Sequence, residues 1–165
     1  MAAMNLINMA MSALSFFWAL LVIALTGNYI ASGGNSSMIG YDLFCGVFAM
    51  LSLAYLIPAS LKESIAIHPI LPLVLNCLNL LFWFIGGIAT AAYLHVHSCS
   101  KSAYYLSNHT AGGSEKKCRE AQATTAFLWF GFASFLASTV LSGLGTRGGA
   151  NTRPGVRRGP AMSQV

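Results

Sequence analysis

The amino-acid sequence predicts an all-α membrane protein, a bundle of four transmembrane helices followed by a C-terminal tail. The chain of 165 residues is 56% hydrophobic and only 8% charged, whereas soluble domains carry about 25% charged residues. Its few charges are unevenly spread. Asp42 is the only charged residue before residue 62, and residues 64–100 and 121–146 contain none. Stretches of this kind suit the hydrocarbon of a bilayer better than water.

Four stretches are long enough to cross about 30 Å of hydrocarbon, which takes about 20 helical residues. They cover residues 6–29, 41–59, 69–94 and 121–144. The first has no Lys or Arg before it and is longer than the apolar core of a signal peptide, so we expect it to be retained as a helix. Pro58 is expected to end the second helix. Pro72 falls in the first turn of the third, where proline is tolerated.

The connections between these stretches differ in length and composition. Residues 31–40 form a short turn rich in Gly, Ser and Asn, and residues 60–68 a short loop. Residues 96–120, called the polar segment below, form the only long connection and hold six charged residues. The four spans make up one domain, residues 1–144. Residues 145–165 are rich in Gly, Pro and Arg, and we expect them to be disordered.

Two cysteines near the ends of the polar segment indicate how the bundle is oriented. Four spans place both termini on one side, and the Lys/Arg counts of the two sides are nearly equal, five against four. Cys99 and Cys118 can meet if the helices that flank the segment are neighbours. A disulfide here would stabilise the fold by about 3 kcal/mol and would persist outside the cytosol. The alternative is a pair of free thiols in a cytosolic loop.

Two N-glycosylation sequons lie on the same side as the polar segment. They begin at Asn35 and Asn108. Together with the cysteine pair, they favour an extracellular polar segment and cytoplasmic termini.

The pattern His95-x-His97-x-Cys99 resembles part of a zinc site. At a helix end, however, alternate residues point about 200° apart, so we interpret the histidines as interfacial residues beside a disulfide. We assign no metal, no cofactor and no catalytic residue. The four acidic residues are scattered and no histidine has a nucleophile placed beside it in a catalytic arrangement, so an enzyme is not expected.

Polar and small residues inside the spans predict how the helices meet. Asn76 and Asn79 share one face of the third helix, either as hydrogen-bonding contacts between helices or as a polar site for a lipid headgroup or solute. With Asp42 taken as bordering the second span, no span has an acidic or basic residue in its interior, which argues against a pump or proton-coupled carrier. Small residues recur at close-packing spacing: Gly46 with Ala49, Gly86 with Gly87, Ala133 with Ala137, and Ser134 with Ser138.

Three stretches carry a resemblance to a known family. They are "HSC" at residues 97–99, "KCREAQATTAFLWF" at residues 117–130 and the ending "MSQV" at residues 162–165. With the span count, they resemble the fungal non-classical export proteins, four-helix membrane proteins of the MARVEL class. The resemblance implies a plasma-membrane protein of eisosome-associated microdomains. It also implies roles in organising these domains, in responding to sphingolipid status and in unconventional protein export.

The expected function is therefore a non-enzymatic membrane organiser, and the alternative is a small oligomeric transporter or channel subunit. The expected partners are membrane lipids, sphingolipid or anionic, together with other microdomain proteins or a cytoplasmic coat, and the expected assemblies include a homo-oligomer. The net charge of +5 does not indicate nucleic acid, because the basic residues form no patch with aromatic side chains. Basic residues near the membrane attract anionic lipid, and the tail contributes four: Arg147, Arg153, Arg157 and Arg158.

Overall fold

A computed structural model of the chain describes residues 2–61, 70–95 and 98–151, and its side chains within 6–59, 70–95 and 98–144. The described residues form helices and connections, with no strand among them. The helices are α1 (Ala2–Ala31), α2 (Ser37–Leu61), α3 (Leu71–Leu94), α4 (Ser102–Ser107) and α5 (Glu115–Asn151).

Four of these helices are long and apolar enough to cross a membrane, which confirms the predicted fold class. The candidate spans are Leu6–Ala31, Ser37–Ala59, Leu71–Leu94 and Glu115–Leu144. The shortest of them, on α2, has 23 residues and reaches about 34 Å at 1.5 Å per residue. Each span therefore matches or exceeds the hydrocarbon thickness of a bilayer.

Helices α1, α2 and α5 extend beyond the limits expected from the sequence, and α2 already begins at Ser37, inside the expected turn of residues 31–40. α2 continues through Pro58 to Leu61. A proline inside a helix removes one backbone hydrogen bond and can kink the helix without ending it. α5 starts at Glu115, inside the polar segment, and continues to Asn151. The pairs Glu115–Arg119 and Lys116–Glu120 lie one turn apart and support its first turns. The expected start of the tail at residue 145 is thus too early, and residues 152–165 lie outside the described residues.

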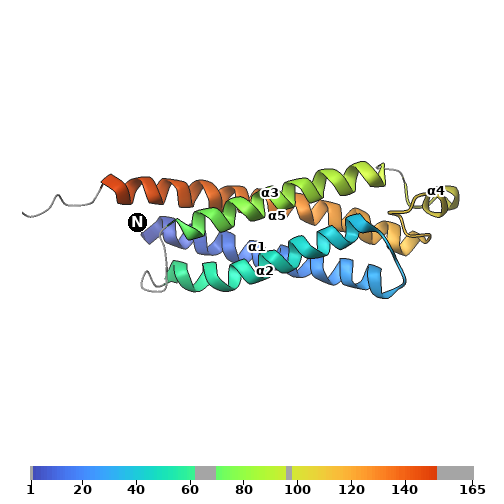
Figure 1. Ribbon diagram of the computed structural model, residues 1–165, viewed down its shortest axis with the longest axis horizontal. Coiled ribbons are helices and arrows are strands. Elements are labelled where there is room, and N and C mark those ends of the chain that lie inside the picture. The colour runs from blue at the N-terminus through green and yellow to red at the C-terminus, as the bar shows by residue number, and fades with distance from the viewer. Residues whose placement is uncertain (1, 62–69, 96–97, 152–165) are drawn as a thin grey trace, which may run out of the picture.

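The four long helices form a closed bundle. α5 packs along α1 and α3, α1 packs along α2, and α2 packs along α3. α4 lies beyond one end of the bundle, beside the start of α5, while the first residues of α1 and the last of α5 lie at the opposite end (Figure 1). The polar segment therefore covers one end of the bundle only.

Close approaches of backbone and side chain hold the middle of the bundle together. Trp83 of α3 is fully buried, and its ring packs against the Phe135 ring in a tilted orientation, with the two centroids 5.5 Å apart. A Cβ atom at Gly131 of α5 would lie only 2.0 Å from this indole ring. Gly46 of α2 similarly lets Ile23 of α1 approach, because a Cβ there would lie 2.7 Å from the Ile23 side chain. Small residues thus fix the distances between helices, as is typical inside membranes.

Candidate functional site

The polar segment closes one end of the bundle through its two cysteines. Cys99 follows α3, and Cys118 lies in the first turns of α5. The structure brings their sulfurs to bonding distance, with the Cα atoms 5.7 Å apart, as in disulfides. Both side chains are buried with Tyr29 of α1 and Leu94 of α3 in a small apolar cluster. The segment is therefore packed onto the helix ends.

Hydrogen bonds from three side chains fasten the same segment to the helices. Asn108 Nδ2 donates to the carbonyl oxygen of Tyr93 at 3.0 Å, and its Oδ1 accepts from the backbone N–H groups of Thr110 and Ala111. Tyr29 donates to the Thr110 carbonyl oxygen at 3.1 Å. The Tyr104 hydroxyl donates to the carbonyl of Leu94, and burial raises the pKa of this phenol, which keeps it a donor.

The two sequon asparagines have different surroundings. Asn35 is exposed in the turn between α1 and α2. Asn108 is half-buried and uses both ends of its amide to hold the polar segment, and Thr110 of the same sequon is 4% exposed. Glycosylation at either site stays a prediction. Of the two asparagine side chains, that of Asn35 is the more exposed to solvent.

The zinc-like pattern of histidines and cysteine does not form a metal site among the described residues. Within residues 2–61, 70–95 and 98–151 no group of three His, Cys, Asp or Glu side chains could hold a metal ion. The Cys99 sulfur lies at bonding distance from the Cys118 sulfur, and His95 ends α3 with its backbone in the left-handed region at φ 51°. His97 lies outside the described residues.

Two asparagines of α3 contact neighbouring helices at the opposite half of the bundle. Asn79 is fully buried, and its Nδ2 donates to Ser52 Oγ of α2 at 2.7 Å and to the Leu75 carbonyl at 2.9 Å. Asn76 is 4% exposed and donates to Ser142 Oγ of α5 at 3.3 Å. The two amides thus point to different partners and link α3 to both of its neighbours.

Replacing both Asn76 and Asn79 by leucine is expected to lower the free energy of unfolding by about 1 kcal/mol, because interhelical hydrogen bonds in membrane proteins contribute modestly. Thermal unfolding in detergent measures the loss, with Cys77→Leu, an exposed position on the same helix, as the control. Unchanged stability combined with loss of microdomain assembly would instead indicate a recognition role for the two amides.

Asp42 and Glu120 are two acidic residues that the structure buries. Asp42 was expected to border the second span, but it lies inside α2 and is fully buried, with Thr90 of α3 donating to its Oδ2 at 2.7 Å. Glu120 of α5 is 9% exposed and accepts a hydrogen bond from Asn28 of α1. The expectation that no span has an acidic residue in its interior is therefore wrong, and the single Asp within an apolar stretch was the sequence signal that could have shown this.

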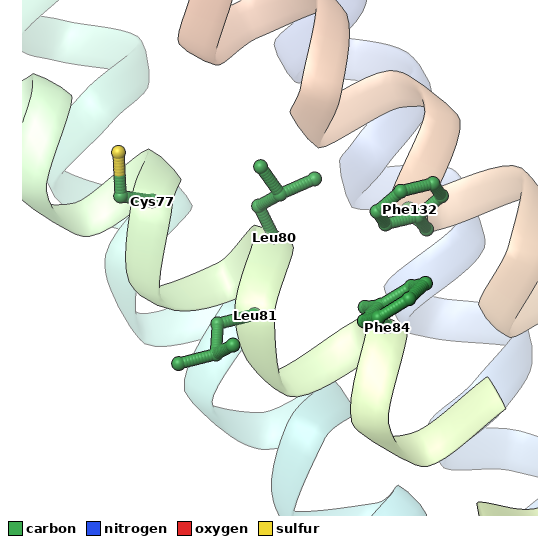
Figure 2. Close-up of a pocket in the computed structure, with 5 residues that line it drawn as sticks. All are labelled: Cys77, Leu80, Leu81, Phe84 and Phe132. Atoms are coloured by element: carbon green, nitrogen blue, oxygen red, sulfur yellow. The ribbon is translucent and has the colours of Figure 1, made fainter. Parts of the chain in front are cut away.

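The outer surface of the long helices is apolar and contains an open groove between α3 and α5. The groove has a volume of about 420 Å³ and is lined by Cys77, Leu80, Leu81, Phe84 and Phe132. Figure 2 shows the Phe84 and Phe132 rings side by side at one end of it, with centroids 5.2 Å apart. Large apolar side chains such as Leu51 (69% exposed) also face outward. The surface suits lipid chains.

The tail arginines cannot be placed in this site. Arg147 falls within the bounds of α5, but its side chain lies outside the described part of the structure. Arg153, Arg157 and Arg158 lie wholly outside the described residues.

Comparison with known proteins identifies the family. The MARVEL family model, described as a membrane-associating domain, matches residues 6–141. The chain belongs to the MARVEL family. This match covers all four candidate spans nearly to their ends, so the MARVEL domain and the helix bundle coincide.

Relatives of this MARVEL protein confirm the resemblance to fungal non-classical export proteins. "Non-classical export protein 102" of Candida albicans is 32% identical over 165 residues, covering 96% of this chain and 97% of the relative. "Non-classical export protein 2" of Saccharomyces cerevisiae is 38% identical over 109 residues, 66% of this chain and 62% of the relative. A Schizosaccharomyces pombe homologue is 31% identical over 114 residues, 69% and 62% of the two chains. The match thus spans less than two thirds of two of these relatives. No solved structure matches the chain.

Proposed function

We propose that this MARVEL protein is a non-enzymatic organiser of plasma-membrane microdomains of the eisosome type, linked to sphingolipid status and to unconventional protein export. The observation that supports this proposal is where polar and apolar side chains lie in the bundle. Buried polar groups such as Asn79 and Thr90 bond to neighbouring helices, while large apolar groups such as Leu51 and Phe130 face outward. Such a molecule offers lipids and other membrane proteins a long apolar surface. The names of its relatives support the link to export.

The groove between α3 and α5 supports the lateral role. Its walls are leucine and phenylalanine side chains, and Trp129 extends the aromatic surface with its ring 6.0 Å from Phe84. An apolar recess of this kind takes lipid chains or an apolar side chain of a partner helix through van der Waals contact. The partners proposed are sphingolipid or anionic lipids and other microdomain proteins.

The organiser function is tested by imaging a fluorescently tagged chain and by deleting it. A patchy cortical distribution, together with loss of the patches of other microdomain proteins on deletion, is the expected result. A uniform distribution and intact patches in the deletion strain would contradict the proposal. Reconstitution in liposomes should give no solute flux.

A second candidate function, a small oligomeric transporter or channel subunit, is favoured by one observation. Asp42 is an ionisable residue buried in a span, and such residues often mark ion or substrate pathways. Solute flux in the liposomes that is lost in Asp42→Asn would support this candidate over the organiser.

We also propose that the polar segment is extracellular and cross-linked by a Cys99–Cys118 disulfide, with both termini in the cytoplasm. In a Cys45→Ala, Cys77→Ala background, a non-permeant thiol reagent on intact cells should label neither remaining cysteine until a reductant is added. Labelling without reductant would exclude the disulfide. Labelling only after permeabilisation would show that the topology is the reverse of the one proposed.

The tail is proposed to hold anionic lipid or a cytoplasmic coat protein through its arginines. A basic residue close to an anionic leaflet contributes about 1 kcal/mol, so four contribute about 3–4 kcal/mol. Changing all four to glutamine is expected to disperse the patches while the topology is kept, as measured by imaging and by the thiol assay. Persistence of both patches and topology would refute the contact. The four residues are Arg147, Arg153, Arg157 and Arg158.

A further inference from the structure

Asp42 is the one acidic residue that α2 carries, and it lies within a candidate membrane span. It is the sixth residue of α2, and its side chain is fully shielded from solvent. The carboxyl group points across to α3. Thr90 donates a hydrogen bond to its Oδ2 at 2.7 Å. Its Oδ1 is buried and has no hydrogen-bond partner among the described residues.

Gly86 of α3 provides the space for this carboxyl group. A Cβ atom at position 86 would lie 3.0 Å from Asp42 Oδ1, 3.5 Å from the Tyr41 ring and 3.6 Å from Leu128 of α5. The oxygen therefore lies near a junction of α2, α3 and α5, buried and without a hydrogen-bond partner among the described residues. Any larger residue at position 86 would force the carboxyl group to move.

No ion pair to Asp42 is found among the described residues, whose ion pairs are Lys116–Glu120 and Glu115–Arg119. α1 and α3 contain no Asp, Glu, Lys, Arg or His. On α5, the charged residues are those of residues 115–120, near its start, and Arg147, far beyond Leu128. The titratable neighbours on α2 itself are Tyr41 and Cys45, and both donate to the Phe82 carbonyl of α3.

A metal ion is no better placed to neutralise the group. No three His, Cys, Asp or Glu side chains gather anywhere in the described residues. A hydrated cation would also need several oxygen ligands, whereas Oδ1 has no polar partner among the described residues. A carboxylate in such surroundings loses its hydration without compensation, so the neutral acid is the form that fits.

We propose that Asp42 is a proton-binding site inside the bundle and that the bound proton holds α2 against α3. With the proton on, the carboxyl group is neutral and accepts the Thr90 hydrogen bond in a dry, close-packed position. When the proton leaves, the negative charge has no partner between the two helices, and water must enter to solvate it. Helices α2 and α3 then separate at the Gly86 contact.

Infrared spectroscopy of the purified protein in detergent tests the first half of the proposal. The wild type should show the C=O stretching band of a protonated carboxylic acid at neutral pH. Asp42→Asn, which keeps size and hydrogen bonding, should remove the band, whereas Glu120→Gln should retain it. Thr90→Val should shift the band to higher frequency, because the carbonyl loses its donor. Absence of the band in the wild type, or its persistence in Asp42→Asn, would overturn the assignment.

Thiol labelling at Cys45 tests the second half. Cys45 is fully buried, lies one turn from Asp42 and faces α3, so it reports on separation of the two helices. In a Cys77→Ala background, a small permeant thiol reagent is applied from about pH 6 to about pH 9. The same series with Asp42→Asn added measures the intrinsic pH dependence of the thiol.

The ratio of the two labelling rates decides the outcome. It is the rate in the Cys77→Ala background divided by the rate in the same background with Asp42→Asn added. If ionisation opens the α2–α3 contact, this ratio should rise by about tenfold or more across the range, since ionisation of a carboxyl group below its pKa increases about tenfold per pH unit. A constant ratio would show that the charge does not separate the helices and would overturn the coupling.

A second variant keeps the test decisive should Asp42→Asn fail to fold. Thr90→Val in the same background removes the hydrogen bond to the carboxyl group and should bring the opening to a different pH. An unchanged labelling profile in this variant would count against the proposal.

Discussion

Replacing Gly131 by alanine is expected to lower the free energy of unfolding by about 3 kcal/mol, the upper end for an overpacked core. The added Cβ atom would lie 2.0 Å from Cζ3 and 2.1 Å from Cε3 of the Trp83 indole. Trp83 is fully buried against Phe135 and cannot turn away. α3 and α5 must therefore separate. Chemical unfolding in detergent, followed by tryptophan fluorescence or circular dichroism, measures the loss.

Gly143 of the same helix provides the matched control. A Cβ atom there meets no atom within 4 Å, so Gly143→Ala should leave stability unchanged or raise it by up to about 1 kcal/mol through helix propensity. A second variant, Trp83→Leu, replaces the indole ring, with which the alanine Cβ at position 131 would clash, by a smaller side chain. Combined with Gly131→Ala, it should cost less than the sum of the two single changes. Equal effects of the two Gly→Ala changes would show that Gly131 does not set the helix spacing.

Replacing Cys99 and Cys118 by serine is expected to lower the free energy of unfolding by about 3 kcal/mol in the chain-entropy account of a disulfide. The two residues are 19 positions apart in the sequence. Both lie in the buried cluster with Tyr29 and Leu94, so hydroxyl groups there add a cost of burial. The polar segment should then become accessible to protease, and limited proteolysis and thermal unfolding both measure the change.

Reduction of the wild-type protein is the chemical counterpart of this variant. It should produce the greater part of the same loss, while Cys77→Ser, an exposed position on α3, should have little effect in either condition. If the oxidised wild type and the double-serine variant unfold at the same temperature, the cysteine pair does not stabilise the bundle.

Much of the fold could be predicted because the length of an apolar stretch is a local property. A run without charges must leave water and, in a bilayer, must become helical to satisfy its backbone. The limits of the spans at Leu94 and near Ala31 followed from this alone. The errors occurred where local stability added turns, at Pro58 and before Cys118. A proline can kink a helix without ending it, and ion pairs one turn apart support the first turns of α5.

The contacts within the bundle could not be predicted in the same way. The four spans are apolar all round, and lipid is as apolar as a leucine side chain, so hydropathy does not indicate which face of a helix turns inward. Of the small residues singled out in α5, Ser134 and Ser138 are buried, whereas Ala133 is exposed. Gly131, the closest approach of all among the described glycines, was missed.

The sequence by itself determined the class of protein, the number and order of its spans, the polar segment with its cysteine pair and the family resemblance. Those properties depend on composition and on residues near one another in the chain. Only the tertiary structure decided that Asp42 faces Thr90, that Asn79 reaches Ser52 and that Asn108 holds the polar segment to α3. Such pairs depend on how each helix is rotated about its axis. Close packing of small and large side chains sets that rotation, and it exists only once all four helices are together.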